Sequence, residues 1–208
     1  MKSRTASGFD QLAPIYGRLS KLVFGNSISQ SQECFLSLIN SRDRILILGG
    51  GSGEFLKSLL QKHPHVTIDY IDLSPRMIEL AKTRSGNLSN VNFIIGTEDT
   101  IPAHTYSVVI TNFYLDLFID KTLDRVIAQI KPHLATNVTW LATDFISEKP
   151  WHKFFTKVMY AFFRVVTRIE ANTLPDWQSA LKNAGLQQIT SQNFYRGFIK
   201  SSVYKRVV

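Results

Sequence analysis

A glycine-rich turn between a short apolar strand and a helix is the segment best suited to bind a ligand. The run Ile45–Leu48 is followed at once by Gly49, Gly50, Gly51 and Gly53. Glycine has no Cβ, so the backbone of such a turn can bend sharply and lie close to a ligand. The helix that begins at Glu54 adds unpaired N–H groups and the positive end of its dipole. This arrangement predicts a site for a nucleotide-like ligand.

The spacing of the glycines and one acidic residue downstream indicate which nucleotide fits. A dinucleotide turn has the spacing G-x-G-x-x-G, but here Glu54 takes the third glycine position, and its carboxylate would repel a pyrophosphate. The next predicted strand, 66–71, is followed by Asp72. Asp72 lies about twenty residues after the turn, the separation at which an acidic side chain binds ribose hydroxyls. The pattern predicts a ligand with a ribose and no pyrophosphate, which describes S-adenosylmethionine (SAM).

Alternating strands and helices would hold this site. Strands are predicted at 44–48, 66–71, 91–95, 107–111 and 137–145, and helices at 54–62, 75–83 (with Ser74 as its N-cap), 121–130, 150–169 and 175–184. Two final strands are predicted at 186–194 and 198–206. This order predicts an α/β fold with a Rossmann-like, doubly wound sheet of seven strands, mostly parallel with an antiparallel edge strand. Ligands bind such sheets at the carboxyl ends of the strands.

Five segments resemble, in order, the motifs of class I SAM-dependent methyltransferases. Residues 45–53 resemble the first motif, V-L-D-L-G-x-G-x-G, and residues 71–78 the second, D-x-S-P-x-M-[IL]. Residues 96–102 resemble the adenine-contact loop, G-D-A-E-x-L-P. The other two matches are the strand segment 106–113 and the turn Ile130-Lys131-Pro132.

The resemblance implies a SAM cofactor, S-adenosylhomocysteine as the second product, and a role for each matched residue. The glycines would shape the turn under the methionine part, and Asp72 would hold the ribose. Leu73 and Met77 would line the adenine pocket, while Asn112 would lie beneath the cofactor. The cofactor-binding residues expected on this basis are Gly49, Gly50, Gly51, Gly53, Asp72, Leu73, Met77, Thr97, Glu98, Asp99, Asn112, Phe113 and Tyr16.

The N-terminal segment resembles one branch of the family. Residues 9–16, F-D-Q-L-A-P-I-Y, are similar to the F-D-x-[IV]-A-x-x-Y-D segment of ubiquinone/menaquinone-type and related small-molecule methyltransferases. The tyrosine of that segment folds over the cofactor, and the alternative for Tyr16 is packing between N-terminal helices. We therefore expect one domain made of an N-terminal helical lid (1–40), a SAM-binding core (41–146), and a cap helix with C-terminal strands (147–208).

Segments after the fourth and fifth strands should face the methyl acceptor. Tyr114 and Asp116 follow the fourth strand, and Asp144 lies at the end of the fifth. The structural alternatives are a core position for Tyr114, a capped loop for Asp116 and a turn cap for Asp144. Trp151, at the start of an aromatic helix, is the fourth candidate for contact with the acceptor. Methyl transfer depends mainly on proximity and alignment, so the sequence identifies no catalytic base.

The last part of the chain carries all of the excess positive charge. The net charge is +8, and residues 149–208 contain ten Lys and Arg against two acidic residues. The helix predicted at 150–169 places apolar residues on one side and basic residues on the other, with His152 on the polar side. The ordinary interpretation is a cap over the core. The alternative is a hydrophobic lid for a lipophilic acceptor, or a surface that makes transient contact with an anionic membrane.

Composition limits the class of protein. With 208 residues and 44% hydrophobic residues, the chain is one globular domain in size. The single cysteine, Cys34, excludes an internal disulfide and fits a reducing compartment. Residues 1–10 are polar, and no apolar run is long enough for a membrane span, so we expect a cytoplasmic protein. The sequence has no cluster of Cys and His residues of the kind that binds a metal, so no metal site is expected.

The expected function is transfer of a methyl group from SAM to a small, apolar or aromatic acceptor. DNA is not an expected partner. One alternative is an RNA methyltransferase, which the basic C-terminal segment favours, although the length leaves no room for an appended RNA-binding domain. Another is a SAM-binding protein without catalysis, because Ile47 and Thr97 stand where the family commonly has acidic residues. Glu54 disfavours a nicotinamide oxidoreductase.

Overall fold

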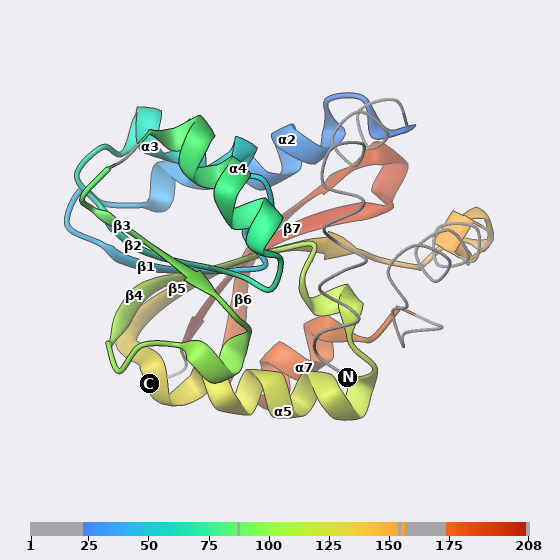
Figure 1. Cartoon of the computed structure of the whole chain (residues 1–208). Coiled ribbons are helices and arrows are strands. Elements are labelled where there is room, and N and C mark those ends of the chain that lie inside the picture. Colours follow the sequence, from blue (N-terminus) through green and yellow to red (C-terminus); the bar gives the residue numbers. More distant parts are fainter. Residues whose placement is uncertain (1–22, 87, 154, 157–173, 207–208) are drawn as a thin grey trace.

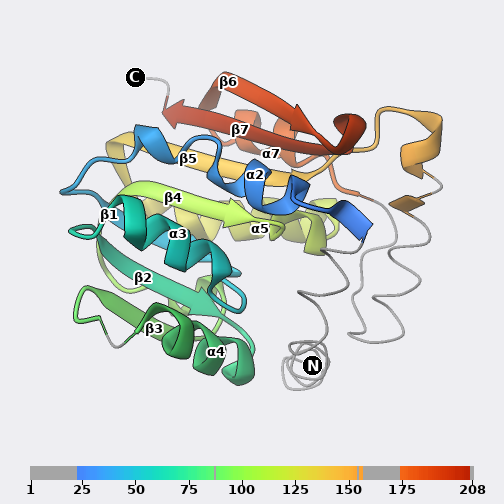
Figure 2. The same ribbon diagram turned by 90° about the horizontal axis from the view of Figure 1, so that it is seen from above.

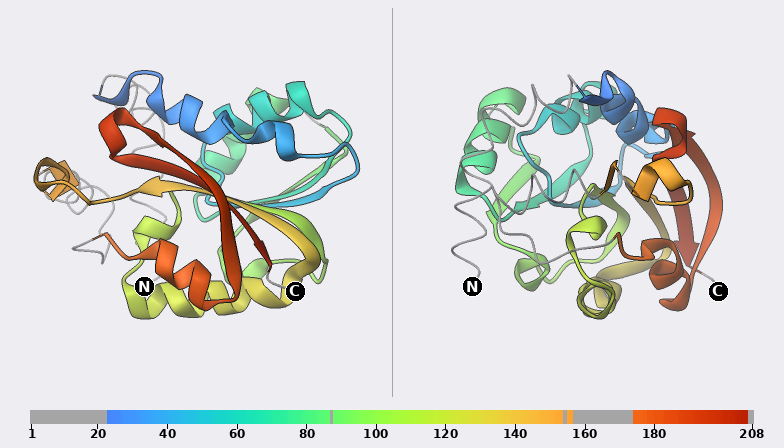
Figure 3. Two further views of the ribbon diagram at one scale, coloured as in Figure 1. Left: turned by 180° about the vertical axis from the view of Figure 1, so that it is seen from behind. Right: turned by 90° about the vertical axis from the view of Figure 1, so that its right-hand side faces the viewer.

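Seven strands in the described part of the chain form one sheet, in the order β3-β2-β1-β4-β5-β7-β6 (Figures 1 and 2). The computed structural model describes residues 23–86, 88–153, 155–156 and 174–206. Neighbouring strands from β3 to β5 pair in parallel, whereas β7 is antiparallel to both β5 and β6. The strands are β1 Arg44–Leu48, β2 Thr67–Asp72, β3 Val91–Ile95, β4 Tyr106–Asn112, β5 Leu134–Phe145, β6 Leu186–Phe194 and β7 Ile199–Arg206. The predicted fold class is confirmed, with the antiparallel pair β6–β7 at the edge of the sheet (Figure 3).

Helices cover both faces of the sheet, with α2, α3 and α4 over one face and α5 and α7 over the other (Figure 1). These helices are α2 Ser27–Glu33, α3 Glu54–Lys62, α4 Pro75–Ser85, α5 Asp120–Ile130 and α7 Trp177–Asn183. Short 3-10 turns lie at η1 Leu36–Leu38, η2 Glu98–Thr100, η3 Leu115–Leu117, η4 Lys131–His133 and η5 Tyr195–Gly197. The start of α4 is as predicted, because the Ser74 hydroxyl accepts the N–H of Met77 at 3.1 Å and Pro75 takes the first helical position.

The central strands are buried on both faces. Ile45 and Ile47 of β1 belong to the core beneath α3 and α4, whereas Leu46 and Leu48 belong to the core against α5 and α7. Continuous apolar runs of this kind are typical of parallel strands between two helical layers. The strand order reverses between β1 and β4, and sheets of this kind generally bind ligands outside the carboxyl ends of the strands at such a reversal.

Two predicted elements reach beyond the described residues. The N-terminal segment predicted at 1–40 is described from residue 23, so Tyr16 lies outside the described part. The helix predicted at 150–169 is described only at its start. Within the residues that the structure describes, no helix has the length and apolar character needed to cross a membrane.

A buried carboxylate at the amino-end half of the sheet provides a test of the fold. Asp69 is buried and accepts hydrogen bonds from the Tyr106 hydroxyl at 2.9 Å and the Asn92 amide at 2.8 Å. We expect Tyr106→Phe to lower the free energy of unfolding by about 1–3 kcal/mol, because the carboxylate loses a donor. Tyr204→Phe is the control, since the Tyr204 hydroxyl donates only a 3.3 Å bond to Gln188. Urea unfolding measures both variants, and equal losses would contradict this account.

Candidate cofactor and acceptor site

The glycine turn after β1 has the backbone shape that the sequence predicts. Gly49, Gly51 and Gly53 have φ angles of 64°, 69° and 85°, in the left-handed region that favours glycine. A Cβ at Gly53 would lie 2.6 Å from the Cα of Ala81 in α4, and one at Gly50 would clash with the Tyr70 ring. A Cβ at Gly51 would meet no atom within 4 Å. The turn is therefore packed against the fold on one side and open at Gly51.

Asp72, at the end of β2, holds this turn in place. Its Oδ2 accepts the N–H of Gly51 at 2.7 Å, and its Oδ1 accepts the N–H of Ser74 at 2.9 Å. From below, the Tyr70 hydroxyl donates to the carbonyls of Gly50 and, at 3.0 Å, of Gly51. The structure thus brings the predicted glycines and the predicted acidic residue together at one edge of the crevice. A half-buried negative charge at this edge can accept hydrogen bonds from hydroxyl groups.

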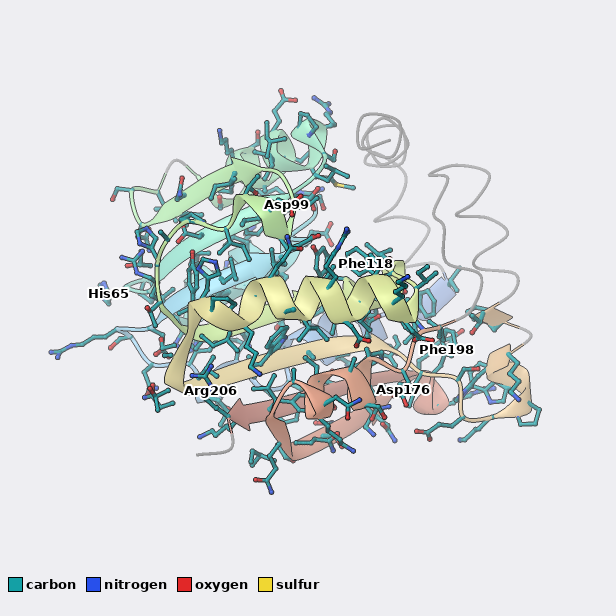
Figure 4. The ribbon with its side chains drawn as sticks, turned by 90° about the horizontal axis from the view of Figure 1, so that it is seen from below. His65, Asp99, Phe118, Asp176, Phe198 and Arg206 are labelled. Carbon is teal, nitrogen blue, oxygen red and sulfur yellow. The ribbon has the colours of Figure 1, made fainter. Side chains whose placement is uncertain are left out.

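The adenine-side candidates lie at the ends of β2 and β3. Met77 is buried in α4, and Leu73 is half-buried beside Asp72. Thr97 begins the turn η2, where Glu98 is buried. The Asp99 carboxylate accepts the Gln129 amide of α5 at 2.7 Å, and Figure 4 shows Asp99 above that helix. Asp99 is thus engaged by α5, whereas Leu73 and Met77 follow directly from the strand that carries Asp72.

Tyr114 forms the wall between the glycine turn and η2. Its ring lies against Gly49, where a Cβ would be 2.6 Å from the ring Cδ2. Its hydroxyl donates to Glu98 Oε2 at 2.9 Å. Burial, together with the charge of Glu98, raises the pKa of the Tyr114 hydroxyl well above its usual value, so Tyr114 stays a neutral donor. Tyr114 therefore ties the segment after β4 to both the glycine turn and η2.

Asn112 and Phe113 connect β4 to this wall. Phe113 has a φ of 54°, an unusual conformation for a large side chain, and its N–H donates to the Thr143 carbonyl of β5 at 2.7 Å. Non-glycine residues held in this region often mark functional sites. The Phe113 ring centre is 4.9 Å from that of Phe145, on the side of β5.

An aromatic cluster extends from Phe113 across the carboxyl end of β5. Its members are Phe24, Phe113, Phe145, Trp151, Phe155, Tyr195 and Phe198. Ring centres are 5.0 Å apart for Phe145 and Phe198 and 5.7 Å apart for Trp151 and Phe198. In Figure 4, Phe118, Asp176 and Phe198 lie toward one end of the sheet and His65 toward the other. The structure thus groups two predicted site residues, Phe113 and Trp151, at the expected end.

A cavity of about 340 Å³ lies beside this cluster. It is lined by Phe145, Ile146, Ser147 and Glu148 after β5, and by Leu174, Pro175, Asp176, Trp177 and Gln178 at the start of α7. These described lining residues include two carboxylates and no lysine or arginine. Residues 174–178 were not among the predicted site residues. The sequence feature that marks them is the helix start at Pro175-Asp176, and such a feature predicts a helix but not a ligand site.

The two acidic acceptor-side candidates lie together. Asp144 is fully buried, and Asp116 is only 4% exposed. Burial raises the pKa of both carboxyl groups. Among the described residues, no group of three or more His, Cys, Asp or Glu side chains could hold a metal ion.

The prediction that His152 faces solvent is wrong. Its side chain is fully covered, and Nδ1 accepts the backbone N–H groups of Glu148 and Lys149 at 3.2 Å each. Burial lowers the pKa of His152, so its neutral form caps the start of the helix. Helical periodicity alone placed His152 on the solvent side of the helix. It does not take into account that a side chain in the first turn can fold back onto the preceding backbone.

Comparison with known proteins finds similarity to methyltransferases. Residues 46–139 match a family described as a methyltransferase domain. The chain is 30% identical over 112 residues to malonyl-[acyl-carrier protein] O-methyltransferase 1 of Ilyobacter polytropus, covering 53% of this chain and 41% of that protein. It is 24% identical over 159 residues to demethylmenaquinone methyltransferase of Thermotoga maritima, covering 74% and 66%. The chain spans about two fifths of the length of the first malonyl relatives.

Solved structures share the fold at low identity. Mitomycin 7-O-methyltransferase MmcR superposes with a TM-score of 0.70 at 17% identity, over 96% of this chain and 60% of that one. The N-methyltransferase NodS from Bradyrhizobium japonicum, solved with S-adenosylhomocysteine, gives a TM-score of 0.65 at 15% identity, over 87% and 86%.

Proposed function

We propose that this chain, a class I SAM-dependent methyltransferase by sequence and fold, transfers the methyl group of SAM to a small, neutral, apolar or aromatic acceptor. The observation that carries the proposal is the open face of Gly51 beside the Asp72 carboxylate. The ligand backbone can lie against Gly51 without a side chain in the way, while Asp72 accepts the ribose hydroxyls. Glu54, directly after the turn, would repel a pyrophosphate.

The roles that we propose for the other described cofactor residues are based on their positions around that edge. Leu73 and Met77 would contact adenine, and Thr97, Glu98 and Asp99 would lie along its rim. Asn112 and Phe113 would support the cofactor from the end of β4, and Tyr16 would cover it from the proposed N-terminal lid, 1–40. When bound, SAM supplies a methyl group on a sulfonium that is already a good leaving group. The residues of the chain then need only to align the acceptor and keep water away.

The acceptor side favours a neutral ring or apolar group over a carboxylate. The aromatic cluster offers flat apolar surfaces, and the cavity beside it is lined by Glu148 and Asp176, with no lysine or arginine among the lining residues that the structure describes. An acceptor carboxylate would meet like charges there, which disfavours binding. A phenol- or quinol-like hydroxyl meets no such repulsion. One relative is named demethylmenaquinone methyltransferase, and the acceptor in that name is of the quinone type.

A second candidate is methylation of a carboxyl group on a carrier-bound acyl chain. Two observations favour it: the relatives named malonyl-[acyl-carrier protein] O-methyltransferase, and the +8 charge concentrated in residues 149–208. A basic surface would attract an acidic carrier protein, or an RNA or anionic membrane in the alternatives that the charge also permits. The acceptor assay separates these candidates.

The test has two stages. Calorimetric titration with S-adenosylhomocysteine should give micromolar binding, and NADH should give none. Methyl transfer from labelled SAM is then measured with quinols and phenols, with a malonyl thioester on a carrier protein, and with bulk RNA. We expect transfer to the first group alone. Cofactor binding without transfer to any acceptor would favour the non-catalytic alternative, and absence of cofactor binding would refute the proposal.

A further inference from the structure

Two buried carboxyl groups meet behind the wall of the site. Asp116 lies in η3, which follows β4, and Asp144 lies near the end of the neighbouring strand β5. Their exposures are 4% and 0%. Buried carboxyl groups in contact are costly unless hydrogen bonds or a proton compensate them.

Asp144 is the hydrogen-bonding centre of the pair. Its Oδ2 accepts the N–H groups of Leu115 at 2.9 Å and Asp116 at 3.2 Å, and its Oδ1 accepts the N–H of Phe145 at 2.9 Å. Because the Asp144 carboxylate accepts the N–H of Asp116 itself, the two buried carboxyl groups lie beside each other. Adjacent carboxylates that are buried away from water repel each other when both are ionised, so one of the two carboxyl groups retains a proton.

The surroundings favour retention of that proton. Burial raises the pKa of both groups, that of Asp116 to about 7, and the charge of Asp116 raises that of Asp144 further. Among the described residues, the titratable group that faces each carboxyl is the other one, and no lysine, arginine or histidine shifts either pKa. The two groups therefore titrate as one unit.

The pair is positioned to control the segment 112–117. Asp144 binds the backbone of Leu115 and Asp116 directly. Just before them lie Phe113, with its positive φ, and Tyr114, which contacts both Gly49 and Glu98. We propose that Asp116 and Asp144 act as one proton-sharing pair that positions the segment 112–117 against the cofactor side of the site. Loss of the shared proton places two like charges in contact and loosens this wall.

The sign of the pH dependence follows from the raised pKa. A carboxyl group whose pKa is higher in the folded state stabilises the fold at acid pH, and this contribution is lost as pH rises from the unfolded value toward the folded one. The window therefore runs from the ordinary aspartate pKa of 3.8 up to about 7 for Asp116, and the raised pKa of Asp144 acts in the same direction. The equilibrium constant for unfolding should rise across this window by as much as about tenfold per pH unit for one titrating proton.

Two asparagine variants separate the roles of the partners. In Asp116→Asn the amide can donate to the Asp144 carboxylate, which keeps its three backbone bonds and needs no shared proton. In Asp144→Asn an NH₂ group takes the place of one carboxylate oxygen. Because this NH₂ group cannot accept a hydrogen bond, a backbone N–H that Asp144 binds loses its acceptor. We expect Asp116→Asn to flatten the pH dependence of both stability and S-adenosylhomocysteine affinity. We expect Asp144→Asn to weaken that affinity by about tenfold or more, the cost of leaving a buried donor unpaired.

The measurements are urea unfolding without ligand and calorimetric titration with S-adenosylhomocysteine, both from about pH 5 to about pH 8, the range around the raised pKa values. The affinity measurement rests on the proposed function, but the unfolding measurement does not. If the wild type binds no S-adenosylhomocysteine, the proposed function fails while unfolding still tests the pair. A pH profile of Asp116→Asn that equals the wild type in unfolding would overturn the pair. So would an Asp144→Asn variant with wild-type affinity in a protein that does bind the cofactor product.

Discussion

Replacement of Asp72 by alanine is expected to weaken S-adenosylhomocysteine binding by about a hundredfold or more. The Asp72 carboxylate accepts the N–H groups of Gly51 and Ser74, so its removal releases both the glycine turn and the start of α4. Hydrogen bonds to charged groups contribute roughly 1.5–3 kcal/mol each, and two of them correspond to at least about two decades of affinity. The proposed bonds to the ribose would be lost as well. Calorimetric titration of the wild type and the variant measures the change.

Asp69 in the same strand provides the matched control. Asp69 is more deeply buried than Asp72, and its partners are Tyr106, Asn92 and Arg44, away from the glycine turn. Asp69→Ala should lower stability and leave S-adenosylhomocysteine affinity within about twofold, because additivity holds for sites without shared partners. If both variants lose affinity equally, the loss reflects damage to the sheet and the proposed role of Asp72 is wrong.

The sequence was most informative where local chemistry alone decides the structure. The strands β1 and β3 have the predicted bounds, since short runs of β-branched residues between turn signals form strands wherever they are buried. The turn after β1 was predictable because only glycine accepts three left-handed residues within five positions. The start of β5 was predicted three residues too late, because the polar residue Thr136 conceals a strand that begins at Leu134.

Contacts between distant segments could not be predicted in this way. Asp116 follows β4 and Asp144 lies near the end of β5, a pattern that places them at one end of the sheet. That the Asp116 N–H donates to the Asp144 carboxylate depends on the register of β4 against β5, which pairs Asn112 with Thr143. The bond from Tyr114 to Glu98 and the wall of the cavity formed by residues 174–178 likewise depend on tertiary packing. Sequence therefore predicted the glycine turn and its neighbour Asp72 better than the contacts around residues 112–117.

Gly51 allows the position of the cofactor to be tested independently of stability. Gly51 and Gly86 have φ angles of 69° and 80°, and a Cβ at either would meet no atom within 4 Å. Alanine at Gly51 should cost about 1–2 kcal/mol of the free energy of unfolding, and alanine at Gly86, whose ψ of 170° lies in a region that almost only glycine adopts, about 1–3 kcal/mol. Gly86 lies at the end of α4, whereas Gly51 lies at the open face of the turn where we place the cofactor.

Gly51→Ala is expected to weaken S-adenosylhomocysteine binding by about tenfold to a hundredfold, and Gly86→Ala to leave it unchanged. The added methyl group would occupy the space that the ligand needs, and a misfit of this size costs roughly 1–3 kcal/mol in a packed site. Urea unfolding measures the loss of stability in each variant, and calorimetric titration shows whether affinity falls only where the methyl group meets the ligand. Equal affinities in the two variants would mean that the cofactor does not pass over Gly51. In that case Asp72 would shape the turn without the turn itself contacting the ligand.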